Sequence, residues 1–519
     1  MVRTAKRLYL PALRWCLRRW QIPLAIALGS LVLSGVLFTR LGREFLPSLD
    51  EGAIGMQTFR LPSVSLEMAR ALETQVERAL REFPEIETVV SKTGRADIAS
   101  DPMGLEVSDV IANLRPRKEW RTAPTKDALV ERIRIRLEQI PGMTYSFSQP
   151  IQLRVDELVS GVKAQIAVKL FGDDLDVLRA KGEDIARAVA SVHGAADVNL
   201  EKTAGTAYLN IAIDREKIAR YGVNVADVED LVDIAIGSRE ATQLREGQRS
   251  FAVVVKFPDA VRADIPRLAN LLVTTANGSR VPLGQLATIT TEEGPGQVSR
   301  ENGQRRIVLE CNVTGRDMGS FVADAQRAVS RQVTLPAGYY VTWGGQFANQ
   351  QRAMAKLSIV VPLVVVLIFL LLFMNFGSLS NALLIILNVP FALVGGVVAL
   401  FVSGQNLSVA ASVGFIALFG VAVLNGVVMV SYFNQLRREG ASLEEAVLRG
   451  GELRLRPVLM TALVAGFGLL PILLAQGPGS EIQRPLASVV VGGLISATLL
   501  TLFVLPILYR WLERREVEF

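Results

Sequence analysis

A stretch of eighty residues, 357–436, contains no Asp, Glu, Lys, Arg or His. A charge at the centre of a membrane helix costs about 2.5–3.5 kcal/mol, whereas no soluble core requires so long a charge-free run. One spanning helix takes about 20 apolar residues, and polar breaks at 375–381 and 403–406 divide the stretch into three. The sequence therefore predicts membrane spans at about 357–376, 381–402 and 408–434.

Three further charge-free segments, at 21–39, 457–476 and 485–509, bring the predicted count to six spans. Arginine and lysine gather beside them in segment 1–20, in the loop predicted at 437–456 and near the C-terminus. Because cytoplasmic loops are enriched in these residues, both termini are expected in the cytoplasm. Segment 1–20 is predicted to be a basic amphipathic helix on the lipid surface. The chain lacks the small-residue cleavage pattern of a signal peptide.

The residues between the first and second spans are polar and are predicted to form a globular region outside the membrane. Of the 519 residues half are hydrophobic, yet 20% are charged, so the chain combines a membrane part with a globular part. A strand, a helix and a second strand recur in four units, at 53–93, 105–149, 163–200 and 305–343. Two such units make a ferredoxin-like α/β sandwich. The predicted fold class is thus a six-helix membrane bundle with a large periplasmic α+β region.

Several function classes are excluded by composition and motifs. The net charge of +6 is modest, and no basic stripe with interleaved aromatics is present, so nucleic-acid binding is not expected. Cys16 and Cys311 should lie on opposite sides of the membrane, so a disulfide between them is not expected. No P-loop, GxSxG or HExxH motif occurs, so the chain is predicted not to be an enzyme and to need no cofactor.

Four segments resemble the resistance-nodulation-division (RND) efflux transporters of the heavy-metal CzcA and CusA type. They are GREFLPSLDEG (42–52), DREKIARYG (214–222), NVPFALVGG (388–396) and RLRPVLMT (454–461). The resemblance covers only the C-terminal half of such a transporter. It implies a linker helix at 1–20, the first span at 21–39, porter subdomains at 40–150 and at 151–205 with 301–350, a docking subdomain at 206–300, the other spans within 357–510 and a cytoplasmic tail at 511–519.

The resemblance also implies partners and an energy source. Such pumps work in the bacterial inner membrane as homotrimers with a periplasmic adaptor and an outer-membrane channel, and this chain would need its missing N-terminal half. The proton-motive force drives them through a buried carboxylate of that missing half. The spans of this chain hold no ionisable residue, but Asn425, Thr461 and Arg454 are candidates for supporting the proton relay. Asn425 and Thr461 are equally compatible with a simple bond between helices.

The resemblance places the substrate path at three positions. Copper and silver pumps of this type carry three methionines, and the corresponding positions here are Gln57, Val107 and Glu157. A carboxylate suits divalent ions better than Cu(I), so Glu157 favours export of Zn, Co, Cd or Ni. Nearby carboxylates are candidates for further oxygen ligands, although strand alternation separates the last two: Asp97, Asp101, Glu106 and Asp109.

Three alternatives stay open at this point. Met56 and Met103 lie close to the motif positions, so a displaced Cu(I) or Ag(I) site is one of them. A pump for organic solutes needs an aromatic-lined pocket, whereas aromatics make up only 7% of the chain. A non-transporting scaffold or a truncated half is the third.

Overall fold

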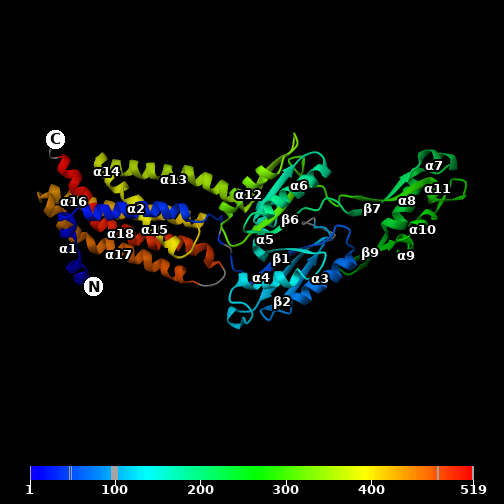
Figure 1. The fold of residues 1–519 in the computed structure, drawn as a ribbon, viewed down its shortest axis with the longest axis horizontal. Helices are drawn as coiled ribbons and strands as arrows, with labels where there is room; N and C mark the ends of the chain where they lie inside the picture. Colours follow the sequence, from blue (N-terminus) through cyan, green and yellow to red (C-terminus); the bar gives the residue numbers. More distant parts are fainter. Residues whose placement is uncertain (1, 46, 48, 95–102, 476–478, 517–519) are drawn as a thin grey trace. The chain divides into compact units, whose positions relative to one another are not determined.

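The computed structural model describes residues 2–516 except 46, 48, 95–102 and 476–478. Within these residues it contains the six predicted spans, each a helix long and apolar enough to cross a membrane (Figure 1). The helices are α2 (Gln21–Arg40), α13 (Gln346–Phe376), α14 (Leu379–Ile386) continued by α15 (Asn388–Val402), α16 (Val409–Arg438), α17 (Leu443–Leu474) and α18 (Ser480–Glu516).

Two of these helices extend far beyond their charge-free segments. The prediction of a loop over 437–456 is wrong from residue 443 onward, because α17 begins at Leu443, where the Ser442 hydroxyl accepts the backbone N–H of Glu445. Helix α13 begins at Gln346, well before the predicted span. The absence of charge marks only the part of a helix that lies in hydrocarbon, whereas a capping residue determines where the helix starts.

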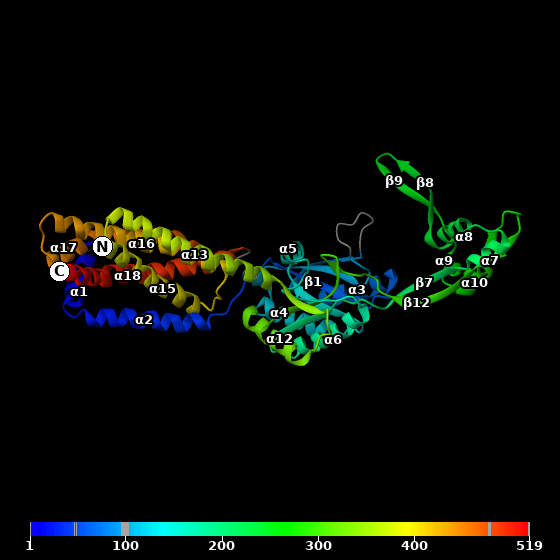
Figure 2. The ribbon, with the colours of Figure 1, turned by 90° about the horizontal axis from the view of Figure 1, so that it is seen from above.

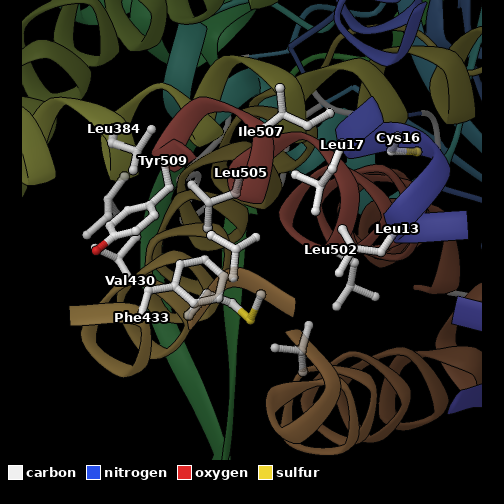
Figure 3. Packing of buried hydrophobic residues seen from close by; sticks show 14 of the residues in the cluster. Leu13, Cys16, Leu17, Leu384, Val430, Phe433, Leu502, Leu505, Ile507 and Tyr509 are labelled. Carbon is white, nitrogen blue, oxygen red and sulfur yellow. The ribbon is translucent and has the colours of Figure 1, made fainter. Parts of the chain in front are cut away.

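Helix α1 (Val2–Arg18) packs against the ends of the membrane helices. Its buried face carries Tyr9, Leu13, Cys16 and Leu17, and Figure 3 shows three of these beside residues of α18. The Tyr9 hydroxyl donates to the carbonyl oxygen of Leu502 at 2.9 Å. The face predicted to contact lipid is therefore partly covered by protein, while three arginines of the helix are exposed: Arg7, Arg14 and Arg18.

Helices α15 and α18 touch through their backbones at Gly395 and Gly492. A Cβ atom on Gly395 would lie 2.1 Å from the carbonyl oxygen of Gly492, and a Cβ on Gly492 would lie 2.5 Å from that of Gly395. At these two positions a side chain would overlap the facing backbone. Close approach of this kind is the usual reason for glycine in membrane helix interfaces.

We expect Gly395→Ala to lower the melting temperature of the chain in detergent by several degrees, since overpacking costs about 1–3 kcal/mol. The matched control is Gly466→Ala on α17, where a Cβ would meet nothing within 4 Å. That control should leave the melting temperature unchanged or raise it, because alanine favours a helix more than glycine does. Equal melting temperatures for wild type and Gly395→Ala would contradict the close packing.

The first α/β subdomain contains the two predicted strand–helix–strand units. Its sheet has the order β2-β3-β1-β4. The two strands of the first unit, β1 and β2, are therefore separated by β3, and the two strands of the second unit, β3 and β4, are separated by β1. Side chains of β1 and β3, including Ile54 and Val110, pack on the helices through Val76, Leu80 and Ile133. The elements are β1 (Ala53–Phe59), α3 (Leu66–Leu80), β2 (Ile86–Thr93), β3 (Val107–Leu114), η1 (Arg117–Glu119), α4 (Lys126–Leu137) and β4 (Thr144–Ser148).

The second α/β subdomain repeats this arrangement after the connecting helix α5 (Pro150–Ser160). Strand β14 lies between β5 and β6, and β15 lies on the other side of β5. Cys311 is buried in this core, Cys16 is buried in α1, and both thiols are free. The elements are β5 (Ile166–Phe171), α6 (Leu175–Ala190), β6 (Ala195–Leu200), β13 (Arg300–Glu301), β14 (Gln304–Val313), α12 (Met318–Gln332) and β15 (Tyr340–Gly345).

Residues 202–298, together with 61–64, form a separate compact unit. Its two long strands, β7 (Thr206–Ile213) and β12 (Ala287–Gly294), pair with each other, and its small core includes Val228, Val273 and Leu283. The strand predicted at 251–257 is β9, which is shifted by two residues and pairs with β8. The other elements are α7 (Arg215–Tyr221), α8 (Val225–Val232), η2 (Asp233–Gly237), β8 (Arg239–Glu246), β9 (Arg249–Val255), α9 (Asp259–Arg262), α10 (Ile265–Ala269), β10 (Leu272–Thr274), β11 (Arg280–Pro282) and α11 (Leu283–Leu286).

Candidate functional site

Two of the predicted site residues are direct neighbours in the first sheet. The register of β1 and β3 places Gln57 opposite Asp109, and the Gln57 amide donates to the Asp109 carboxylate at 3.0 Å. Lys163, on the bend between α5 and β5, reaches the same carboxylate with N–O distances of 3.2 and 3.4 Å. The second α/β subdomain thus supplies a cation to a carboxylate of the first.

Glu157 reaches the same cluster from helix α5. Its Oε2 atom lies 3.8 Å from the Lys163 Nζ atom and accepts a hydrogen bond from Arg154 at 2.8 Å. Asp109 and Glu157 therefore both lie within 4 Å of one ammonium group. The side chains of Lys163, Asp109 and Glu157 are 11, 15 and 25% exposed, so the cluster is mostly shielded from bulk water.

Helix α5 is held in place from its N-terminal end by Glu51. The Glu51 carboxylate accepts the backbone N–H groups of Ile151 at 2.6 Å and Gln152 at 3.0 Å. These N–H groups lie in the first turn of the helix, where they have no partner within the helix. Glu51 belongs to segment 42–52, so one acidic residue of that motif serves to position the helix that carries Glu157.

Asp156 joins α5 to helix α13. The Gln346 amide lies 3.0 Å from both Asp156 carboxylate oxygens, and both side chains are buried. Burial raises the pKa of Asp156 to about 6, although hydrogen bonds from Gln346 and Gln152 oppose that rise. Gln346 is the first residue of α13, so a helix that continues into the predicted membrane region is bonded to the residue beside Glu157.

The other predicted site residues make fewer contacts with Asp109 and Glu157. Val107 is the first residue of β3 and pairs with Phe59. Glu106 precedes the strand, its backbone carbonyl accepts from Arg60 at 2.7 Å, and no hydrogen bond or ion pair given for the described residues joins its carboxylate to Asp109 or Glu157. Asp97 and Asp101 lie outside the described residues. Met56 and Met103 are both buried, and Met56 belongs to the core of the first sheet.

The candidate relay residues fall into two separate sets of contacts. The Thr461 hydroxyl on α17 lies 3.1 Å from the Asn425 carbonyl oxygen on α16 and 2.9 Å from the Val458 backbone carbonyl. The Arg454 guanidinium lies over the Tyr432 ring at 4.4 Å. A buried bond that the sequence did not indicate joins the Asn388 amide of α15 to Thr501 of α18 at 2.6 Å.

The charge of the Asp109–Glu157 cluster decides what it can bind. Lys92 lies 3.5 Å from Asp109, so Lys92, Lys163 and Arg154 together face two carboxylates. Among the described residues no group of three or more His, Cys, Asp or Glu side chains is arranged to hold a metal ion. The cluster has oxygen donors suited to divalent cations, but lysine and arginine occupy them here. Lys163 follows Glu157 by six residues, and that proximity was the only sequence signal for it.

Residues 1–513 match the AcrB/AcrD/AcrF family model. The chain belongs to the AcrB/AcrD/AcrF family. Among curated relatives, the cobalt-zinc-cadmium resistance protein CzcA of Cupriavidus metallidurans is 46% identical over 99% of this chain and 49% of its own length. The nickel and cobalt resistance protein CnrA of the same organism is 42% identical over 97% of this chain and 47% of its own length. The cation efflux system protein CusA of Escherichia coli is 36% identical over 92% of this chain and 47% of its own length.

Solved structures of the same kind support the fold. The crystal structure of a heavy metal efflux pump superimposes with a TM-score of 0.90 at 40% identity and covers 98% of this chain and 52% of that pump. This family member therefore has the predicted RND transporter fold, with six candidate spans and mixed α/β regions. The chain spans about half the length of the curated relatives that it matches.

Proposed function

We propose that this chain is the C-terminal half of a proton-driven RND pump that exports divalent heavy-metal cations of the Zn, Co, Cd and Ni type. The observation that carries the proposal is the convergence of Asp109, Gln57 and Glu157 at one shielded place between α5 and the first sheet. Carboxylate and amide oxygens suit divalent ions better than Cu(I). The relatives named for cobalt, zinc, cadmium and nickel are also more similar in sequence than CusA.

The transported ion is substrate, and no resident cofactor is proposed. The energy source in this proposal is the proton-motive force, with the proton-binding carboxylate located in the missing half. Asn425, Thr461 and Arg454 would support that carboxylate from this half. The Asn425–Thr461 hydrogen bond, in which Asn425 is buried, links two of them across α16 and α17. The α/β subdomains are proposed to lie in the periplasm as the porter region, with both termini in the cytoplasm.

The inserted unit is proposed to be the docking subdomain of a trimer. Its β8–β9 hairpin extends from the rest of that unit (Figure 2), and every residue of both strands is exposed. The hairpin carries apolar side chains on its surface, among them Leu244, Phe251 and Val255. Exposed apolar strands favour association, which supports contact with a neighbouring subunit, the missing half, the periplasmic adaptor or the outer-membrane channel.

The test is cell-associated metal in bacteria that co-express this chain with a matching first half. We expect the wild-type pair to lower cellular Zn, Co, Cd or Ni, and Glu157→Ala to restore the level of cells without the pump, because one of the two converging carboxylates is lost. Mass spectrometry measures the metals. Glu138→Ala, at an exposed position after α4, is the control and should export like wild type.

Other outcomes of this experiment separate the alternatives. A response of copper or silver alone would favour a displaced soft site that uses Met56 or Met103. No response to any metal would favour an organic substrate or a non-transporting scaffold. Full export by Glu157→Ala would remove Glu157 from the substrate path.

A further inference from the structure

Lys163 occupies the place where a cation bound by Asp109 and Glu157 would have to lie. Its ammonium group is within 4 Å of both carboxylates, and the Lys163 side chain is slightly more buried than that of Asp109. A protonated lysine has three donors and no lone pair, so it cannot be a metal ligand. It can only compete with a metal ion for the same oxygens.

The charges around the carboxylates make this competition strong. Asp109 and Glu157 supply two negative charges, while Lys163, Lys92 and Arg154 supply three positive charges at 3.2, 3.5 and 2.8 Å from them. Lys92 and Arg154 are about half exposed, so water and salt screen them. Lys163 is screened least. A divalent cation can therefore enter only if the Lys163 ammonium leaves.

The chain offers Lys163 a second position. The bend at 161–165 follows the left-handed Gly161 at φ 70°, and the backbone N–H of Lys163 donates to the carboxyl group of Glu310 on β14. Burial raises the pKa of Glu310 to about 7; the Lys163 N–H opposes this rise and the Glu201 charge adds to it. The half-buried Glu310 carboxyl group next to the Lys163 backbone can accept the ammonium when it swings away on its flexible four-carbon stem.

We propose that Lys163 is a built-in competitor of the transported cation. Its ammonium neutralises Asp109 and Glu157 when the site is empty, moves aside when a divalent ion enters, and returns to expel the ion at release. This inference rests on the proposed function of the same site. It explains how a shielded pair of carboxylates can both bind and release a cation, because the Lys163 ammonium replaces the charge of the ion when it leaves.

The test is the dissociation constant of Zn²⁺ and of Co²⁺, each alone, for the purified full chain in detergent, measured by titration calorimetry. We expect Lys163→Leu to lower the dissociation constant at least about fivefold, since a unit charge about 4 Å away is worth at least ~1 kcal/mol even in water. Lys181→Leu is the control: this lysine pairs with Asp184 on α6 at 3.1 Å and is not one of the charges that face Asp109 and Glu157, so the dissociation constant of this variant should match that of wild type. Glu157→Gln should raise the dissociation constant for both metal ions.

Export gives a second readout that moves in the opposite direction. In cells that carry a matching first half, Lys163→Leu should leave more Zn or Co in the cell than wild type, because the ion is released more slowly. A structural role for Lys163 predicts weaker binding instead. Unchanged or weaker binding in a Lys163→Leu chain that melts like wild type would overturn the inference. Weaker binding by Glu157→Gln would support the metal site whatever Lys163→Leu does. If neither wild type nor Lys163→Leu binds metal, both this inference and the proposed function are overturned.

Discussion

Glu73→Leu is expected to destabilise the first α/β subdomain by about 3–5 kcal/mol, because it leaves the Arg60 guanidinium buried without its carboxylate. The side chains of Arg60 and Glu73 are only 1 and 4% exposed. One Arg60 nitrogen contacts the Glu73 carboxylate and the hydroxyls of Thr58 and Ser108, and the other donates to the Leu105 carbonyl at 3.0 Å. A loss of this size is a large fraction of the 5–15 kcal/mol typical of a whole domain.

Amide hydrogen exchange of β1 and β3 measures this effect in the full chain. Glu82→Leu is the control, since Glu82 forms a two-point ion pair with Arg136 at 2.6 and 2.8 Å on the exposed surface and should change exchange little. The double variant Arg60→Met/Glu73→Leu should recover much of the loss, because no charge is then left buried. Exchange in Glu73→Leu that matches Glu82→Leu would show that the buried pair contributes nothing.

Asp156→Asn is expected to stabilise the chain at pH 7.5 much more than at pH 5. Burial raises the pKa of Asp156 to about 6 from 3.8, so the folded state prefers the neutral acid. The resulting stabilisation is complete below the unfolded pKa near 4 and is lost as the pH rises through about 6. The difference between these limits is on the order of 3 kcal/mol. Asparagine is neutral at every pH and keeps an oxygen for the Gln346 amide.

Melting temperatures in detergent at the two pH values measure this effect. Asp127→Asn, an exposed aspartate in the first turn of α4, is the control and should shift the melting temperature equally at both. An equal shift for Asp156→Asn at pH 5 and pH 7.5 would show that Asp156 is ionised in the fold at both values.

The membrane spans and the α/β repeats could be predicted because each depends on local sequence. The absence of charged residues over 357–436 is visible in the sequence itself and is enough to predict a lipid environment. Alternation and helical spacing likewise predict the strand–helix–strand units, and β1, α3 and β2 form as the first unit requires. Helix starts at Gln346 and Leu443 were missed, because a charged turn can continue a helix outside hydrocarbon.

The sequence by itself determined the residue types of the candidate site: a carboxylate at Glu157, an amide at Gln57 and no methionine at either position. Only the tertiary structure decided which side chains meet there. Lys163 reaches Asp109 across 54 positions of the chain, and Glu51 fixes the helix that carries Glu157 across 100. Such contacts depend on how two subdomains pack, and a short-range pattern contains no information about that packing. The charge balance of the site, and with it the competition between lysine and metal, therefore follows from the fold.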